Sequence, residues 1–78
     1  TEAGGLGSAH SQLYRSLLEK EQWSRKEATE LCGNLNLMLG GALEVINDWS
    51  YAVVDAPVLD DADDDIWVDL EIAKELEG

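Results

Sequence analysis

The chain has 78 residues, of which 17 are acidic and 5 basic, so its formal net charge is −12. This length supports one domain with a small core, and an apolar content of 45% argues against general disorder. The negative charge disfavours nucleic acid and anionic lipid as partners, and favours cations or basic protein surfaces. No apolar run approaches the roughly 18 residues that a membrane span needs, so we expect no insertion into a membrane.

The N-terminal segment is rich in glycine. Residues 1–8 contain Gly4, Gly5 and Gly7 and show no apolar periodicity. They are predicted to be a flexible linker or a vector-derived remnant, with a single domain over residues 9–78. The chain also lacks an initiator Met, which is typical of a domain taken from a longer protein.

Two helices are predicted in the first half of the chain. From Ser11 to Glu21, apolar residues recur four apart and form one stripe; they are Leu13, Tyr14, Leu17 and Leu18. Ser24 and Glu27 have the spacing of a capping box, in which each side chain bonds the other residue's backbone N–H. A second helix is therefore predicted from Ser24 to about Asn36.

The third predicted helix runs from about Gly41 to Asp55. Its predicted core face consists of Ala42, Val45, Ile46, Trp49 and Val53, flanked by Leu43 and Ala52. Pro57 disfavours helical geometry at the residue before it, so the helix should stop ahead of Ala56.

The last part of the chain predicts a hairpin and a short helix. Two β-prone runs, Val58–Leu59 and Ile66–Val68, flank the acidic run Asp60–Asp65 and suggest two strands joined by an acidic loop. Asp69 is placed to cap a final helix. The predicted fold is α+β and mainly α: three helices, a two-stranded hairpin and a short C-terminal helix in a winged-helix-like arrangement. A small all-α bundle is the alternative.

The acidic run is the first candidate site. Adjacent carboxylates repel one another, and a bound Ca²⁺ or Mg²⁺ would relieve that repulsion with the oxygen ligands that both ions prefer. An EF-hand loop starting at Asp61 would require Gly and Glu where this chain has Ile66 and Ile72, so that motif is not present. A solvated loop that protects the hairpin edge is the simpler interpretation. The candidate metal ligands are Asp60, Asp61, Asp63, Asp64 and Asp65, together with Glu44 and Asp48.

The outward face of the third helix is the second candidate site. It carries Glu44, Asn47, Asp48, Tyr51 and Asp55. In a DNA-binding winged helix this face would enter a phosphate-lined groove, and its three carboxylates argue against that role. The pair Glu44 and Asp48 is instead a candidate for binding a cation or a protein partner. Trp67 is either an exposed anchor for a partner or, as we expect, packed against the third helix.

No catalytic arrangement is indicated. His10 is the only histidine and lies beside the glycine-rich segment, and Cys32 falls on the apolar face of the second helix as a small core residue. The sequence Gly40-Gly41 lacks the spacing and the Lys of a phosphate-binding loop. We therefore expect a protein that is not an enzyme.

Several stretches together resemble the TerB C-terminal (TerB-C) domain. They are WSRKE (23–27), LMLGGALEVINDW (37–49), PVL (57–59), the acidic run, and IWVD (66–69). The most specific is Gly41–Trp49, and the resemblance covers about Leu13 to Leu76. It implies a cytoplasmic accessory domain of bacterial multidomain proteins linked to tellurite resistance and stress response, without established catalytic activity. It also implies acidic positions proposed to chelate metal, which correspond here to Glu44 and Asp48 and extend to the acidic run.

Two functions follow as hypotheses. In the first, the domain docks a neighbouring TerB-like domain or another member of a stress-response complex through the acidic face of the third helix. In the second, it is a divalent-cation module that binds Ca²⁺ or Mg²⁺ through its clustered carboxylates.

Overall fold

The computed structural model describes residues 6–62 and 64–77, without the side chains of Ala62 and Glu77. In chain order, the elements are α1 (Ser8–Leu17), β1 (Gln22–Ser24), α2 (Arg25–Asn34), α3 (Leu39–Val54), β2 (Leu59–Ala62), β3 (Asp65–Val68) and α4 (Leu70–Glu77). The predicted α+β, mainly helical class is confirmed, and the all-α alternative is excluded.

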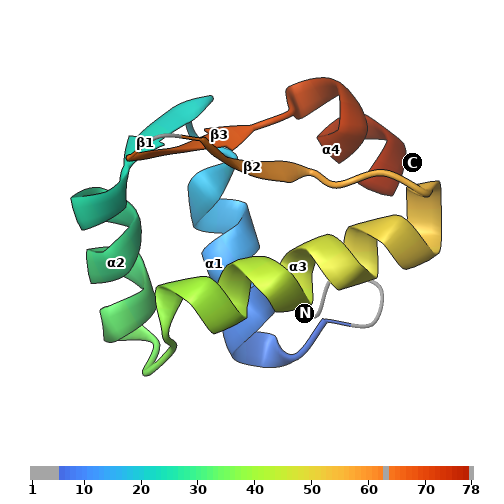
Figure 1. The fold of residues 1–78 in the computed structure, drawn as a ribbon. Coiled ribbons are helices and arrows are strands. Elements are labelled where there is room, and N and C mark those ends of the chain that lie inside the picture. The colour runs from blue at the N-terminus through green and yellow to red at the C-terminus, as the bar shows by residue number, and fades with distance from the viewer. Residues whose placement is uncertain (1–5, 63, 78) are drawn as a thin grey trace.

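The sheet lies across the helices, and α4 lies over the C-terminal part of α3 (Figure 1). The order α1-β1-α2-α3-β2-β3 is that of a winged helix, with the β2–β3 hairpin as the wing. Apolar residues from the helices and the sheet meet in one core. Its most deeply buried members are Leu13, Leu17, Ala28, Cys32, Ile46, Val58 and Ile66.

The strand β1 was not predicted. The sheet order is β1-β3-β2, and Trp23 of β1 lies opposite Ile66 of the central strand β3. The Val68 N–H donates to the Glu21 carbonyl at 2.7 Å, which extends this pairing. A strand of three residues has too little sequence for an alternating pattern to show, and its partner lies far along the chain.

The acidic run is mostly strand, which corrects the prediction of a loop over Asp60–Asp65. Asp60 and Asp61 belong to β2, and Asp65 begins β3. Asp63 lies outside the described residues. Acidic residues are disfavoured in strands by propensity, but here the hydrogen bonds of the ladder to β3 and the buried Leu59 override that preference.

The first helix begins earlier than predicted. α1 starts at Ser8 with Gly7 as its N-cap residue and ends at Leu17. Leu6 is only 2% exposed and belongs to the core, so the predicted linker over residues 1–8 is wrong at this position. Residues 1–5 lie outside the described part of the chain. The surrounding glycines hid Leu6, because one apolar residue among them shows no period.

The third helix starts at Leu39 and is followed by Asp55, which caps it in the left-handed conformation with φ 59°. Its buried residues are Leu39, Ala42, Leu43, Ile46 and Ser50. Val45 and Val53 were predicted to lie in the core, but they are 41% and 52% exposed. The buried stripe includes Ser50, which the predicted core face did not contain. The Ser50 hydroxyl donates to the Ala56 carbonyl at 2.5 Å, so this buried polar group is satisfied.

Local capping predictions are confirmed at two helices. The Ser24 Oγ accepts from the Glu27 N–H at 3.1 Å, and the Glu27 carboxylate accepts from the Ser24 N–H at 3.1 Å, so the capping box opens α2. At α4 the Asp69 carboxylate accepts from the backbone N–H groups of Glu71 and Ile72. Both helix starts are fixed by residues within one turn of each other.

The capping box gives a prediction for pH dependence. The hydrogen bond from Lys20, followed by those at Ser24, lowers the pKa of Glu27 below its ordinary value of 4.5. The unfolded chain therefore binds this proton more readily than the folded one. The ionised Glu27 carboxylate therefore stabilises the folded state above pH 4.5, and this contribution is lost as the pH falls through the folded-state pKa.

Glu27→Gln keeps an acceptor oxygen but removes the charge. We expect its free energy of unfolding to fall less steeply than that of the wild type between about pH 5 and pH 3. Urea unfolding of both proteins across that range measures the effect. Glu30→Gln, at an exposed position on the same helix, is the matched control. Equal slopes for Glu27→Gln and the wild type would contradict the assignment.

Candidate functional site

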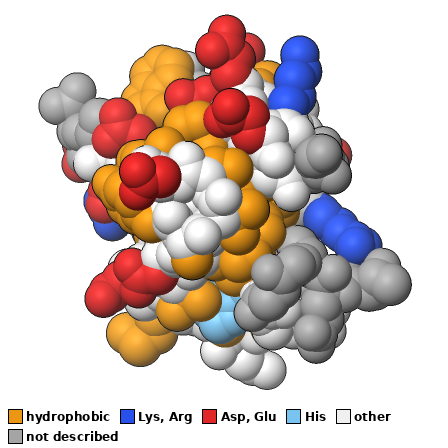
Figure 2. All heavy atoms as spheres, turned by 90° about the vertical axis from the view of Figure 1, so that its right-hand side faces the viewer, with side chains coloured by type: hydrophobic (Ala, Val, Ile, Leu, Met, Phe, Trp, Pro, Cys, Tyr) orange, Lys and Arg blue, Asp and Glu red, His pale blue; other side chains and the backbone are white. Residues whose placement is uncertain are grey.

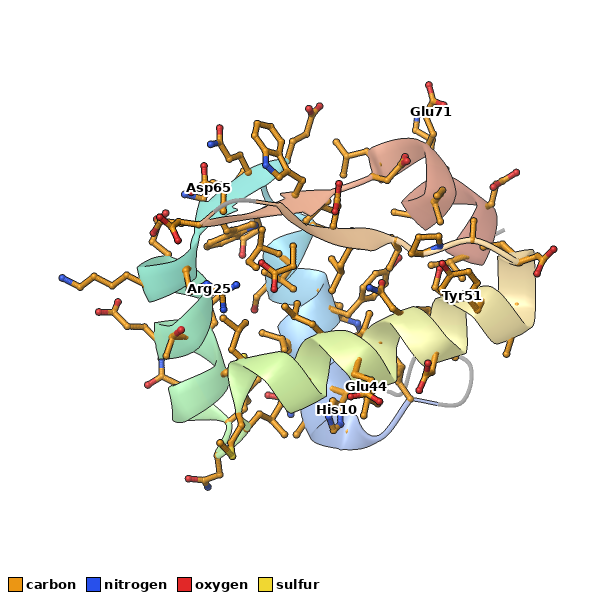
Figure 3. All side chains as sticks on the ribbon, viewed as in Figure 1. His10, Arg25, Glu44, Tyr51, Asp65 and Glu71 are labelled. Atoms are coloured by element: carbon orange, nitrogen blue, oxygen red, sulfur yellow. The ribbon has the colours of Figure 1, made fainter. Side chains whose placement is uncertain are left out.

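The outward side of α3 presents an acidic row with one aromatic residue. Glu44, Asp48 and Tyr51 are exposed and lie at helical spacing on the side opposite the buried stripe. Glu44 lies near the middle of α3 and Tyr51 on its C-terminal part (Figure 3). We call these three residues the α3 acidic face. Within the described residues, no ion pair or side-chain hydrogen bond engages any of them, so their polar groups are available to a partner.

Asn47 was predicted to belong to this outward face, but its side chain points to the sheet. Its Nδ2 donates to the Leu59 carbonyl and its Oδ1 accepts from the Leu59 N–H, each at 2.9 Å. Both amide groups are therefore used to hold the start of β2 against α3. Asp55 is exposed but lies just beyond the end of the helix, where its own N–H donates to the Tyr51 carbonyl at 3.0 Å.

Exposed apolar residues on α3 accompany the carboxylates. Val45 is 41% exposed, and Tyr51 and Val53 are each 52% exposed. Figure 2, which shows the end of the molecule near the C-terminus of α3, has a band of hydrophobic side chains bordered by acidic ones. Periodicity alone placed both valines in the core, and only the position of the neighbouring elements shows that they lie at the surface.

The predicted metal ligands that the structure describes, which leaves out Asp63, do not form a metal-binding group. No group of three or more acidic, His or Cys side chains that could hold a metal ion occurs in residues 6–62 and 64–77. Asp61 forms an ion pair with Arg25 at 2.5 Å, and Asp65 accepts a hydrogen bond from the Gln22 amide. Glu44 and Asp48 lie on α3, away from this end of the hairpin. Asp60 and Asp64 are exposed, and Asp63 lies outside the described residues.

The three tryptophans occupy different surroundings. Trp23 donates its indole N–H to the Leu17 carbonyl at 2.9 Å, and the Lys20 ammonium lies 4.4 Å from the centre of its ring. Trp49 meets Tyr14 edge to face, with 5.2 Å between ring centroids. Trp67 is 42% exposed on the outer side of β3, so the expectation that it packs against the third helix is wrong. The signal for this exposure was the buried pair Ile66 and Val68, which forces the residue between them outward.

Cys32 and His10, the two residue types most often used as nucleophile and base, lie on different helices, α2 and α1. Cys32 is fully buried, and burial raises the pKa of its thiol, which disfavours the reactive thiolate. His10 is partly buried on α1, and neither residue belongs to a cluster of ligating side chains in the described part of the chain. The geometry therefore gives this cysteine a packing role.

None of the helices in residues 6–62 and 64–77 has both the length and the apolarity that crossing a bilayer requires.

Comparison with known proteins identifies the family. No curated protein and no solved structure gives a significant match. The family model of the TerB-C domain matches residues 1–77, which include all the elements described above. The chain therefore belongs to the TerB-C domain family.

Proposed function

We propose that this domain is a non-catalytic interaction module of a bacterial, cytoplasmic multidomain protein linked to tellurite resistance or stress response. It docks the adjacent TerB-like domain of the parent chain, or a member of the same complex, through the α3 acidic face. The observation that carries this proposal is the exposed row of Glu44, Asp48 and Tyr51, none of which is engaged by another side chain in the described residues.

This row has the composition of a protein-binding surface. Tyr51 combines a large apolar ring with a hydroxyl, and tyrosine is among the residues that anchor protein interfaces. Val45, three residues before Asp48 on the helix, adds exposed apolar area next to the carboxylates. The carboxylates of Glu44 and Asp48 favour a partner with basic residues and speed its approach, since the whole chain is strongly negative. The same charges repel nucleic-acid phosphates.

The alternative of a divalent-cation module gains no support from the geometry. Its candidate ligands are divided between α3 and the hairpin, and the Asp61 carboxylate is paired with Arg25. A tight Ca²⁺ or Mg²⁺ site needs six or more oxygen atoms converging on one point. The interaction function is therefore the one we retain.

Reversal of two charges tests the proposal. We expect Glu44→Lys combined with Asp48→Lys to weaken binding of the adjacent TerB-like domain at least tenfold, because attraction to a basic partner becomes repulsion. Isothermal calorimetry with the two domains as separate chains measures the affinity, and a backbone amide NMR spectrum shows whether the fold is kept. The control is Glu19→Lys combined with Glu30→Lys, which changes the net charge equally at exposed sites near α1 and on α2. Unchanged affinity in the α3 variant, with the fold intact, would refute the docking role.

A further inference from the structure

The outer face of the sheet has a tryptophan at its centre. Trp67 lies on the middle strand β3, opposite Gln22 of β1 on one side and Asp60 of β2 on the other. Its neighbours along the strand, Ile66 and Val68, are buried in the core. Residues directly opposite in an antiparallel pair bring their Cβ atoms within about 5.5 Å, so the side chains of Asp60 and Trp67 leave neighbouring positions on the same face of the sheet.

The hydrogen bonding around Trp67 leaves one carboxylate available. The Gln22 amide donates to Asp65, so these two residues satisfy each other across the strands. Asp60 is exposed, and no ion pair or hydrogen bond of its side chain occurs in the described part of the chain. An exposed indole and an available carboxylate thus lie next to each other on this face.

Elsewhere in the same molecule this combination holds a cation. The Lys20 ammonium lies 4.4 Å from the ring centre of Trp23 and 2.9 Å from the Glu27 carboxylate. The face of an indole attracts cations through its quadrupole, and a carboxylate next to it adds direct charge attraction. Trp67 and Asp60 present the same two groups to the outside. With 5 basic residues against 17 acidic ones, the chain has little positive charge to offer them.

We propose that the outer face of the sheet binds a protein segment that presents an arginine or lysine side chain. The cation of that segment lies on the Trp67 ring and pairs with the Asp60 carboxylate. This surface is distinct from the α3 acidic face, because it is formed by the sheet and β3 separates it from the core. The domain then has two docking surfaces, and the second recognises a single basic side chain through an aromatic ring and an acid.

A short peptide tests this directly. The probe is a glycine-arginine peptide with blocked ends, and its control is the same peptide with citrulline, which has nearly the same shape without the charge. Three indole N–H signals in the NMR spectrum report separately on Trp23, Trp49 and Trp67. We expect the arginine peptide to shift the Trp67 signal saturably in the millimolar range, and the citrulline peptide to shift it far less.

Variants separate the two recognition groups from general charge attraction. Trp67→Leu keeps apolar bulk but removes the aromatic face, and should weaken binding of the arginine peptide about 3- to 30-fold. Because this variant lacks the Trp67 indole signal, its binding is measured from the backbone amide signals of Gln22 and Asp60. Asp60→Asn should also weaken binding, whereas Glu30→Gln removes one negative charge from an exposed position on α2, outside both proposed surfaces, and should have little effect. Retained binding in the Glu44→Lys and Asp48→Lys double variant would show that this surface is independent of the proposed α3 interface.

Several results would overturn the proposal. One is that the arginine peptide does not shift the Trp67 indole signal. Others are that the citrulline peptide binds as tightly as the arginine peptide, or that Trp67→Leu binds the arginine peptide as tightly as the wild type does. Equal effects of Asp60→Asn and Glu30→Gln would also overturn it, since that result indicates general attraction to a negative protein rather than binding at Asp60. So would loss of peptide binding in the folded α3 double variant.

Discussion

Replacing Ile46 with alanine should lower the free energy of unfolding by about 2–5 kcal/mol, which is a large part of the total for a domain of this size. Ile46 is completely buried at the centre of the α3 stripe. The substitution removes apolar surface from the core and leaves a cavity that the surrounding helices and sheet fill only in part. Urea unfolding followed by circular dichroism measures the loss, and a fall in Tm of at least 8 °C should accompany it, at about 4 °C or more per kcal/mol.

The neighbouring Val45 provides a matched control. It is 41% exposed, so Val45→Ala should change the unfolding free energy by less than about 0.5 kcal/mol. The pair also tests the orientation of α3, because the sequence pattern places both residues on one core face. Comparable destabilisation by the two substitutions would mean that the helix is rotated from the orientation described here.

The second large effect is expected at Asn47. Asn47→Ala leaves both the N–H and the carbonyl of Leu59 without their side-chain partner at a partly buried site. An unsatisfied buried polar group costs about 1–3 kcal/mol, so the two together should lower stability by about 2–6 kcal/mol. Chemical denaturation measures the change, and amide hydrogen exchange at Leu59 should speed up more than exchange in α1.

Asn47→Asp separates the two hydrogen bonds. The ionised carboxyl still accepts from the Leu59 N–H but repels the Leu59 carbonyl, and only its protonated form donates there. The pKa of the introduced carboxyl should therefore be raised in the folded state, so the deficit relative to wild type should be largest at neutral pH and shrink as the pH falls. Asn34→Ala, at an exposed position in α2, is the control. A deficit independent of pH would show that the donated bond contributes nothing.

Features set by neighbouring residues were predictable from the sequence. The box of Ser24 and Glu27 and the cap at Asp69 lie within one turn of the helices that they start, and both are present. The family was recognisable for a similar reason, because the run Gly41–Trp49 is contiguous. The end of α3 before Pro57 also follows from the restriction that proline imposes on its neighbour.

Features set by distant residues were not predictable. β1 is a strand only because β3 lies beside it, and nothing in Gln22–Ser24 encodes that partner. Ser50 is buried, and its hydroxyl is satisfied by the Ala56 carbonyl, a partner that the residue type does not reveal. Asn47 was wrongly predicted to face outward, because its amide takes the place of a backbone partner for Leu59.

For the candidate site, the sequence placed Glu44, Asp48 and Tyr51 correctly on the outer side of α3, because their spacing fixes them to one side of any helix. It did not separate them from Asn47, whose partner belongs to another element. The exposure of Trp67 was also missed, although alternation within β3 contains the signal. The available carboxylate beside that ring depends on strand register, which the sequence does not specify.

The central position of β3 has a consequence for how the protein is made. The side-chain hydrogen bond from Gln22 to Asp65 joins residues 43 apart along the paired strands β1 and β3, and β3 also supplies Ile66 and Val68 to the core. On the ribosome, α1, α2 and α3 therefore leave the exit tunnel before the strand that completes their core has emerged. Such non-local pairing slows folding relative to a helical bundle and prolongs the exposure of apolar faces. A nascent chain that ends before Val68 should remain unfolded, and the domain should reach its native structure only when nearly its whole length has left the exit tunnel.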